Sequence, residues 1–290
     1  MPQIPIALDL DGSLRKLEGV QRLDLSAWQE RIRFGCGWRT WHAFSRVLEP
    51  LLPPEPGPVF LGSGDFHHLT YFLLARRPVD DPVEVIVLDN HPDNMRFPFG
   101  IHCGSWVAHA ARLPSVTRIH VLGITSADVS LPHAWENRLS PLYRGKVRYW
   151  TLGVAVGWAR YLGLGAAVRA FDSVASLCEA FLDTVGRGRD PVYFSLDKDV
   201  LDPAVVRTNW DQGRFTVEAI GTLIRGLSGR IAGSDVTGEV SSYRYRSGWK
   251  RLLSALDGQE TPPAQELARW QDRQLAVDRT LLALLQGAAR

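Results

Sequence analysis

The chain contains little cysteine and no long hydrophobic run. Cys36, Cys103 and Cys178 are its three cysteines, and none belongs to a C-x-x-C pair, which excludes a disulfide scaffold and fits a reducing compartment. No stretch approaches the roughly 18 consecutive apolar residues of a membrane-spanning helix. The N-terminus lacks the basic segment of a signal peptide, and Asp9 and Asp11 interrupt its apolar run. We therefore expect a cytoplasmic protein with no membrane partner.

Strong charge of one sign is also absent. The 33 Lys and Arg residues are nearly balanced by 31 Asp and Glu residues, which gives a formal net charge of +2. This balance, with no basic tail, excludes the electrostatic signature of a nucleic-acid-binding protein. Apolar residues make up 45% of the chain, which is ordinary for a soluble globular protein and sufficient for a full hydrophobic core.

Short apolar runs alternate with longer helical patterns along the chain. The predicted strands cover residues 4–10, 59–62, 83–89, 118–124, 147–152, 191–197 and 230–236. The predicted helices cover residues 40–48, 67–76, 105–112, 173–185, 216–227 and 263–285. Several strand runs are almost entirely apolar, as in strands that are buried on both faces. The alternation predicts an α/β protein with a parallel sheet and helices on both of its faces.

Polar clusters follow three of the predicted strands. They are Gly64-Asp65-Phe66-His67-His68, Asp89-Asn90-His91-Pro92-Asp93 and Asp197-Lys198-Asp199. In an extended chain every second side chain points to the same side, so the acids and histidines of a cluster can converge. Because ligands bind beyond the carboxyl ends of the strands in such sheets, we expect the three clusters to form one site.

The chemistry of these clusters favours two metal ions. The four aspartates of the second and third clusters would repel one another in one crevice unless a cation lay among them. Carboxylates with imidazoles and without thiolates suit Mn²⁺ better than structural zinc. Six ligands, some of them able to bridge, are enough for two divalent ions about 3.5–4 Å apart. Such a site would be close to neutral and would accept a cationic electrophile.

The motifs resemble those of the ureohydrolases, which include arginase, agmatinase and formimidoylglutamase. The most specific match is S-x-D-x-D-x-L-D-P, which here runs from Ser195 to Pro203, and the matching motifs together cover residues 59–240. The resemblance implies a single arginase-like three-layer α/β domain over residues 1–290, with a mostly parallel sheet of about eight strands flanked by helices. It also implies a hydrolase in which a metal-bridging hydroxide attacks a C–N bond of a guanidino or amidino small molecule.

Carried over residue by residue, the resemblance implies two sets of site residues. The ligands of two divalent ions, expected to be Mn²⁺, are His67, Asp89, His91, Asp93, Asp197 and Asp199. In this assignment Asp89 and Asp197 bridge both ions. The catalytic residues are Asp93, His102 and Glu239. His102 resembles the family's proton-shuttling histidine, and Glu239 resembles the glutamate that holds the guanidinium group.

The sequence departs from the family's pattern at several positions. Phe66 separates the first aspartate from a pair of histidines, so His67 is favoured as the ligand and His68 is the alternate. One extra residue lies between Asp235 and Glu239. Arginase's loop for the α-amino and α-carboxylate groups is not recognisable, which favours a decarboxylated or otherwise modified guanidine over free arginine.

Three other functions stay open at this point. A histone-deacetylase-like enzyme would share the architecture and hydrolyse an acylated amine with one zinc ion. Asp9-Leu10-Asp11-Gly12-Ser13 resembles the nucleophile motif of haloacid-dehalogenase-type phosphatases, in which Asp9 would attack phosphorus. A non-enzymatic member could keep the metal for stability or for a partner surface. A homo-oligomer is also left open.

Overall fold

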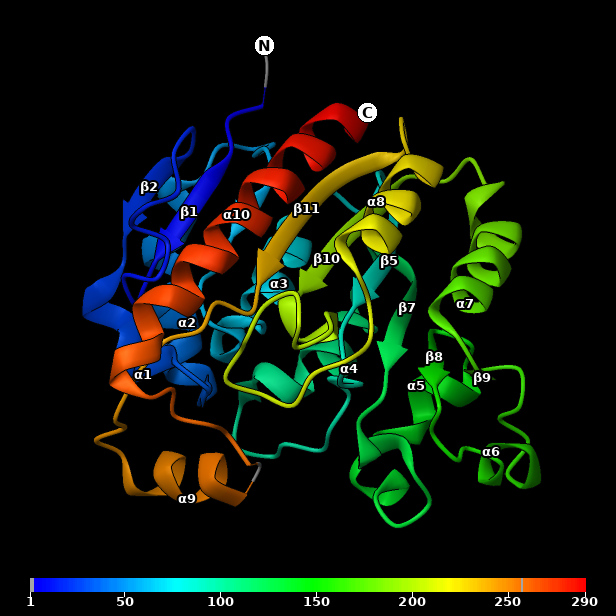
Figure 1. Cartoon of the computed structure of the whole chain (residues 1–290). Coiled ribbons are helices and arrows are strands. Elements are labelled where there is room, and N and C mark those ends of the chain that lie inside the picture. Colours follow the sequence, from blue (N-terminus) through cyan, green and yellow to red (C-terminus); the bar gives the residue numbers. More distant parts are fainter. Residues whose placement is uncertain (1–2, 257) are drawn as a thin grey trace.

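The computed structural model describes residues 3–256 and 258–290 and has a nine-stranded sheet at its centre (Figure 1). The strand order is β2-β1-β4-β11-β10-β5-β7-β8-β9, and every neighbouring pair is parallel. The strands are β1 (Ile6–Asp9), β2 (Gln21–Asp24), β4 (Val59–Phe60), β5 (Val83–Leu88), β7 (Val116–Ile124), β8 (Val147–Leu152), β9 (Val168–Phe171), β10 (Val192–Asp197) and β11 (Ile231–Thr237). The α/β class and the parallel sheet predicted from the sequence are confirmed.

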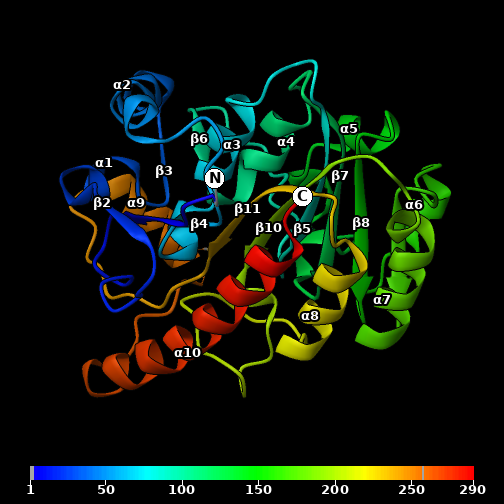
Figure 2. The same cartoon turned by 90° about the horizontal axis from the view of Figure 1, so that it is seen from above.

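Helices cover both faces of the sheet. Figure 2 shows α2 (Trp38–Leu48), α3 (Leu69–Ala75) and α4 (Trp106–Ala110) on one side, and α7 (Val174–Phe181), α8 (Val217–Gly226) and α10 (Ala264–Ala288) on the other. Each of these six helices was predicted from the sequence. Further helices lie in the connections: α1 (Gln29–Ile32), α5 (Leu139–Tyr143), α6 (Trp158–Tyr161) and α9 (Gly248–Leu256).

The two faces of the sheet carry separate hydrophobic cores. Along β5, Val83, Val85 and Val87 belong to the core beneath α2, α3 and α4, whereas Ile86 and Leu88 belong to the core beneath α7, α8 and α10. This alternation follows from the two-residue repeat of a strand. All six residues of β5 are buried, which explains the continuous apolar run by which the sequence marks this strand.

The connections place several loops at the carboxyl edge of the sheet. In Figure 1 the central strands run downward, and α9 lies below them, at that edge. A small antiparallel pair, β3 (Gly35–Cys36) with β6 (Ile101–His102), brings two loops together. A side chain at Gly35 would clash with Cβ of His102, so this close approach requires glycine.

No helix in the described part of the chain combines the length and the apolar character that crossing a membrane requires. This finding agrees with the absence of a long hydrophobic run in the sequence.

Candidate metal centre

The three predicted clusters lie together at the carboxyl ends of β4, β5 and β10. Leu88 of β5 is paired with Leu196 of β10, so Asp89 and Asp197, which come next in each strand, start at the same level of the sheet. The loop after β4 reaches the same point across β11, because the order β4-β11-β10-β5 leaves two strand positions between β4 and β5. The strand order changes direction at β5: β7, β8 and β9 follow on one side of it, whereas β10 and β11 lie on the other. In α/β proteins, ligands bind where the strand order changes direction in this way.

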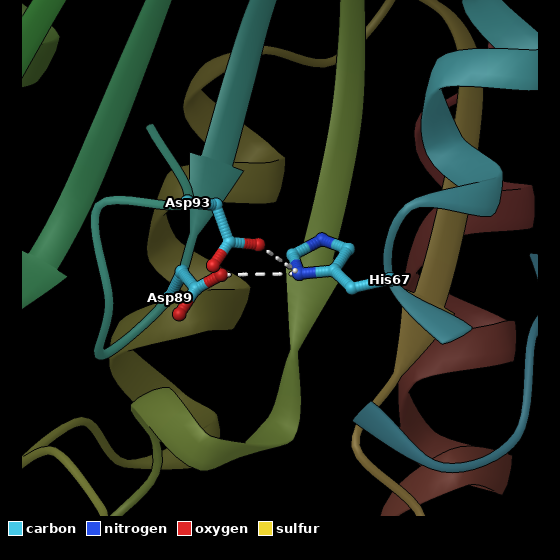
Figure 3. Close-up of side chains that lie close together, drawn as sticks. All are labelled: His67, Asp89 and Asp93. Atoms are coloured by element: carbon cyan, nitrogen blue, oxygen red, sulfur yellow. Dashed lines mark ion pairs between the residues drawn. The ribbon is translucent and has the colours of Figure 1, made fainter. Parts of the chain in front are cut away.

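The first candidate metal group consists of His67, Asp89 and Asp93. Nδ1 of His67 lies 3.1 Å from Oδ2 of Asp89 and 3.0 Å from Oδ2 of Asp93 (Figure 3). Oδ2 of Asp197 lies 3.5 Å from the same nitrogen. All of these side chains are buried. One imidazole nitrogen therefore faces three carboxylates from two different strands.

The second candidate metal group shares Asp89 with the first. Nδ1 of His91 lies 2.9 Å from Oδ2 of Asp199 and 3.6 Å from Oδ1 of Asp89. Within each group, the potential ligand atoms are all within 4.8 Å of one another. Because the two oxygens of Asp89 face different histidines, this carboxylate has the position of a bridge between two ions.

Turns, and not extended chain, produce this convergence. The residue Asp93 adopts a left-handed backbone conformation with φ of 46°, which aspartate tolerates better than most residues. After β10 the chain enters a 3-10 turn, in which Asp197 accepts a hydrogen bond from the backbone N–H of Asp199 at 3.0 Å. The expectation of extended geometry after these strands was therefore wrong, although the side chains do meet.

The electrostatics of the cluster fit a cation. Burial alone would lower the pKa of His67 and that of His91, but the neighbouring aspartates outweigh it and hold both pKa values well above the usual range. Burial and the charge of Asp89 raise the pKa of Asp93 to about 7. Oδ2 of Asp89 is buried and has no hydrogen bond. Without a metal ion, the raised pKa values favour a proton on Asp93 and a positive charge on both imidazoles, and divalent ions would replace these protons.

A chain of hydrogen bonds orients His67. Oγ of Ser195 lies 3.0 Å from Nε2 of His67 and donates to Oδ1 of Asp235 at 2.7 Å. The hydroxyl of Tyr193 donates to the other oxygen of Asp235, also at 2.7 Å. Because the Ser195 hydroxyl is already a donor to Asp235, it accepts from Nε2–H of His67. Nδ1 of His67 is then left as the nitrogen that can bind a metal ion.

The other proposed ligands also have supporting contacts. Oδ1 of Asp211 lies 2.7 Å from Nε2 of His91, and Oδ2 of Asp211 accepts from Nδ2 of Asn90 at 2.9 Å. Nε1 of Trp106 donates to Oδ2 of Asp93 at 2.6 Å. The carboxylate of Asp211 was not predicted from the sequence, because it stands in a loop and not at the end of a strand.

His68 belongs to neither candidate metal group of the described residues. Its ring is buried and packs against Trp41, with 5.7 Å between the ring centroids. Neither ring nitrogen has a hydrogen bond, and burial lowers its pKa well below the usual value. Of the two histidines that the sequence left open, the structure brings His67 to the cluster.

His102 lies in the wall of the same cavity. Its ring is parallel to Phe34 at 5.8 Å and perpendicular to Phe97 at 4.4 Å, measured between centroids. Nδ1 accepts a hydrogen bond from the backbone N–H of Gly104 at 2.9 Å. Burial, with a smaller effect of His109, lowers the pKa of His102 to about 3. The imidazole is therefore neutral, with its proton on Nε2, and the proton-shuttle role stays a prediction.

Glu239 is separated from the other predicted site residues. Its carboxylate is buried against the ammonium group of Lys198, and it is not among the residues that line the cavity. The residue before it, Gly238, has φ of 91°, and a side chain there would clash with Oδ1 of Asp197. This turn directs Glu239 toward Lys198, a geometry that does not agree with the expected contact with a guanidinium group.

A cavity of about 430 Å³ opens above the cluster. His67, Asp89, His91, Asp93, Asp197 and Asp199 all line it. Three further acids, Asp128, Glu136 and Asp211, lie in its walls, and neither lysine nor arginine occurs among its described lining residues. Trp210 supplies an aromatic surface. The cavity is thus acidic well beyond the proposed ligands.

Asp9 does not take part in this site. Its Oδ1 accepts a hydrogen bond from the backbone N–H of Gly12 at 2.8 Å, as in an ordinary turn after a strand. The structure places Asp9 at the end of β1, three strand positions away from β10, and it belongs to neither candidate metal group in the described part of the chain.

Sequence comparisons say little about the chain. No protein-family model matches it. An uncharacterized protein of Thermotoga maritima is 28% identical over 204 residues, which are 70% of this chain and 65% of that protein. The matched part thus spans just under two thirds of that relative.

Structural comparisons identify the fold. The chain is similar to the proclavaminate amidino hydrolase of Streptomyces clavuligerus, with a TM-score of 0.54 and 18% identity over 99% of this chain and 94% of that one. It is similar to the formimidoylglutamase of Bacillus subtilis, with a TM-score of 0.54 and 15% identity over 98% and 86% of the two chains. For the formiminoglutamase of Trypanosoma cruzi with Mn²⁺ the TM-score is 0.52, with 13% identity over 99% and 93%. The chain therefore shares the fold of these three proteins.

Proposed function

We propose that the protein is a metal-dependent hydrolase that uses two divalent ions, expected to be Mn²⁺, to break a C–N bond in a guanidino or amidino small molecule. The observation that carries this proposal is the pair of histidine–carboxylate groups that share Asp89 at the base of an acidic cavity. The names of two similar structures, an amidino hydrolase and a formimidoylglutamase, support the reaction class.

The donor set fits two divalent ions of the Mn²⁺ type. His67 and Asp93 would hold one ion, His91 and Asp199 would hold the other, and Asp89 and Asp197 would bridge. Imidazole and carboxylate ligands without thiolate suit Mn²⁺. Two such ions would supply an activated water molecule and positive charge opposite the oxygen that becomes negative during the reaction.

The protein's own residues would select and orient the substrate. The wall acids Asp128, Glu136 and Asp211 favour a cation, such as a guanidinium or amidinium group, and disfavour a carboxylate. We propose that Asp128 and Glu136 replace Glu239 as the acids that face the substrate. Because free arginine carries an α-carboxylate, we expect the acidic walls to make it a less suitable substrate than a decarboxylated guanidine.

Two further residues would assist the reacting group. His102, neutral and protonated at Nε2, can donate a hydrogen bond to a substrate nitrogen or oxygen. We propose Asp93 both as a ligand and as the carboxylate that accepts a proton from the attacking water. The indole N–H of Trp106 holds Asp93 in place for both roles.

A substrate screen of the Mn²⁺-loaded protein tests the proposal. The panel contains arginine, agmatine, guanidinobutyrate, formimidoylglutamate and an acetylated polyamine, with urea, ammonia, formamide and acetate measured as products. We expect hydrolysis of a cationic guanidine or amidine, with little activity on arginine. Asp89→Asn should abolish the activity, because it weakens the shared ligand.

Asp9→Asn is the matched control, since it makes the same change at the end of another strand. It should leave hydrolysis unchanged. Acetate release without turnover of any guanidine or amidine would instead indicate a deacetylase. Loss of activity in Asp9→Asn together with phosphatase activity in the unaltered protein would contradict the proposal in favour of a phosphatase.

A further inference from the structure

A second cavity, of about 830 Å³, lies outside the metal centre. It is formed by residues that follow α4, by α5 and by the loops beside them, and these two helices lie next to each other in Figures 1 and 2. Its basic lining residues are Arg96, Arg112, Arg138, Arg144 and Lys146. Neither aspartate nor glutamate occurs among the described residues that line it. Five positive side chains thus face one hollow in a chain whose formal net charge is only +2.

The five positive charges lie without carboxylate partners in the part of the chain that the structure describes. None of them pairs with an acid in the described residues, whereas Arg118, close to them in sequence, lies 3.5 Å from Glu84. Nζ of Lys146 donates to the backbone oxygen of Val116 at 3.0 Å, and Nε of Arg96 donates to that of Asn137 at 3.3 Å. These bonds fix the side chains but leave their charges uncompensated.

Arg138 is the clearest example of a positive charge without a counter-charge in this cavity. Its Nε is buried and has no hydrogen bond. Burial and the charges of Arg112 and Arg96 lower the pKa of Arg138. A guanidinium group that meets two others without a counter-charge is costly to hold in place, and an anion in the cavity would relieve both the repulsion and the missing hydrogen bond.

We propose that this cavity binds a small anion that carries two or more phosphate groups. Planar guanidinium groups pair with phosphate oxygens through two parallel hydrogen bonds, and four of the five cations are arginines. The volume is in the range of roughly 300–1,000 Å³ found for sites of small organic ligands and is far larger than one phosphate needs. The confinement of these cations to one cavity, in a chain of nearly balanced overall charge, favours such a small polyanion over a nucleic acid.

The same chain segments line both cavities. Met95 and Asn137 form an antiparallel bridge, the backbone N–H of Arg96 donates to the oxygen of Glu136 at 2.8 Å, and that of Arg138 donates to the oxygen of Asn94 at 2.9 Å. Met95 and Glu136 line the acidic cavity, whereas Arg96 and Arg138 line the basic one. An anion bound to these arginines therefore holds the two segments, residues 94–96 and 136–138, that lie between it and the candidate metal centre. The proposal does not depend on the proposed function.

Calorimetry with pyrophosphate, ATP and inorganic phosphate tests this site. The comparison uses the unaltered protein, the double variant Arg112→Glu/Arg138→Glu, and the control Arg273→Glu/Arg279→Glu, which makes the same charge change on the exposed side of α10. We expect the unaltered protein and the control to bind pyrophosphate and ATP more tightly than phosphate. The cavity variant should bind them at least about tenfold more weakly, because charge-assisted hydrogen bonds are lost.

Hydrogen exchange supplies a second readout. Pyrophosphate should slow amide exchange at residues 94–96 and 136–138 in the unaltered protein and in the control. If the glutamate variant does not fold, Arg112→Gln/Arg138→Gln provides the same comparison with a smaller change of charge. Equal binding by the cavity variant and the control, or no binding of any phosphate probe at millimolar concentration, would overturn the proposal.

Discussion

Nζ of Lys198 lies 2.7 Å from Oδ1 of Asp278, so a lysine between two proposed metal ligands is paired with an acid of α10. The same ammonium group contacts the carboxylate of Glu239, and all three side chains are buried. The two acids raise the pKa of Lys198 although burial alone would lower it. This triad attaches the C-terminal helix to the turn that carries Asp197 and Asp199.

Replacement of Lys198 should strongly destabilise the protein. Lys198→Met removes the one positive charge between two buried acids, and the loss of one partner from a buried ion pair typically costs about 3–5 kcal/mol. Urea denaturation measures this loss. Addition of Glu239→Gln and Asp278→Asn to the same variant should recover much of the stability, because no uncompensated charge then remains.

Lys16→Met is the matched control for this prediction. Lys16 pairs with Asp272 at 2.6 Å, but both side chains are mostly exposed, so the loss should stay within about 1 kcal/mol. Equal stability of the Lys198 and Lys16 variants would show that the buried triad does not support the fold.

Removal of the Ser195 hydroxyl should weaken metal binding without unfolding the protein. Ser195→Ala leaves Nε2 of His67 without its acceptor, and loss of such a supporting contact typically lowers metal affinity about 10–100-fold. Ser115→Ala is the control, because it removes another buried hydroxyl, which donates only to the backbone oxygen of Leu74. Titration with Mn²⁺ compares the two variants, and unchanged affinity in Ser195→Ala would contradict the role given to this serine.

Metal binding should strengthen as pH rises. In the metal-free protein the pKa is raised to about 7 for Asp93 and to about 6 for Asp197, in both cases first by burial, and His67 and His91 are shifted upward too. Groups with raised pKa values stabilise the folded state at low pH and lose that contribution as pH rises through the folded pKa. Asp89, whose pKa is lowered, titrates below this range.

Thermal unfolding with and without Mn²⁺, from about pH 5.5 to pH 8.5, measures this effect. The metal-free protein should become less stable across the range, and the increase in Tm on adding Mn²⁺ should grow. A metal-induced stabilisation that is constant with pH, or that declines as pH rises, would mean that protons and metal ions do not compete at these ligands.

Replacement of His102 should lower turnover while the metal ions stay bound. His102→Asn keeps an acceptor for the N–H of Gly104, as asparagine is a good helix N-cap, but removes the Nε2 donor. We expect turnover to fall about 10²–10⁴-fold. Because burial keeps the ring neutral, the acid limb of the pH–rate profile should not move. A shifted limb, or lost metal, would assign His102 a different role.

The sequence predicted the buried part of the fold better than its edges. The sequence predicts seven strands of the central sheet, and most residues of each are buried: β1, β4, β5, β7, β8, β10 and β11. β2 (QRLD) and β9 (VRAF) are edge strands whose residues are mostly not buried, and neither alternation nor an apolar run marks them. These two strands are missing from the seven that the sequence pattern predicts, whereas the expectation of about eight strands came from the family resemblance; nine are present.

The residues of the candidate site also differ in how well the sequence predicts them. The proposed ligands could be predicted because each follows a recognisable strand. Asp211 could not be predicted, because only the folded loop brings it to His91. The position of Glu239 depends on one glycine and on a lysine whose second partner, Asp278, is 80 residues away in sequence. Such long-range pairing leaves no local pattern.

The number of bound metal ions tests the central proposal most directly. Elemental analysis of protein that was loaded with Mn²⁺ and then freed of excess metal should give two ions per chain. His91→Ala should retain one, since His67, Asp93 and the bridging acids remain, and Asp89→Ala should retain fewer than one. Two ions in the unaltered protein and one in His91→Ala would support the dinuclear centre. A loaded protein that holds no metal, or one ion in both the unaltered protein and His91→Ala, would contradict it.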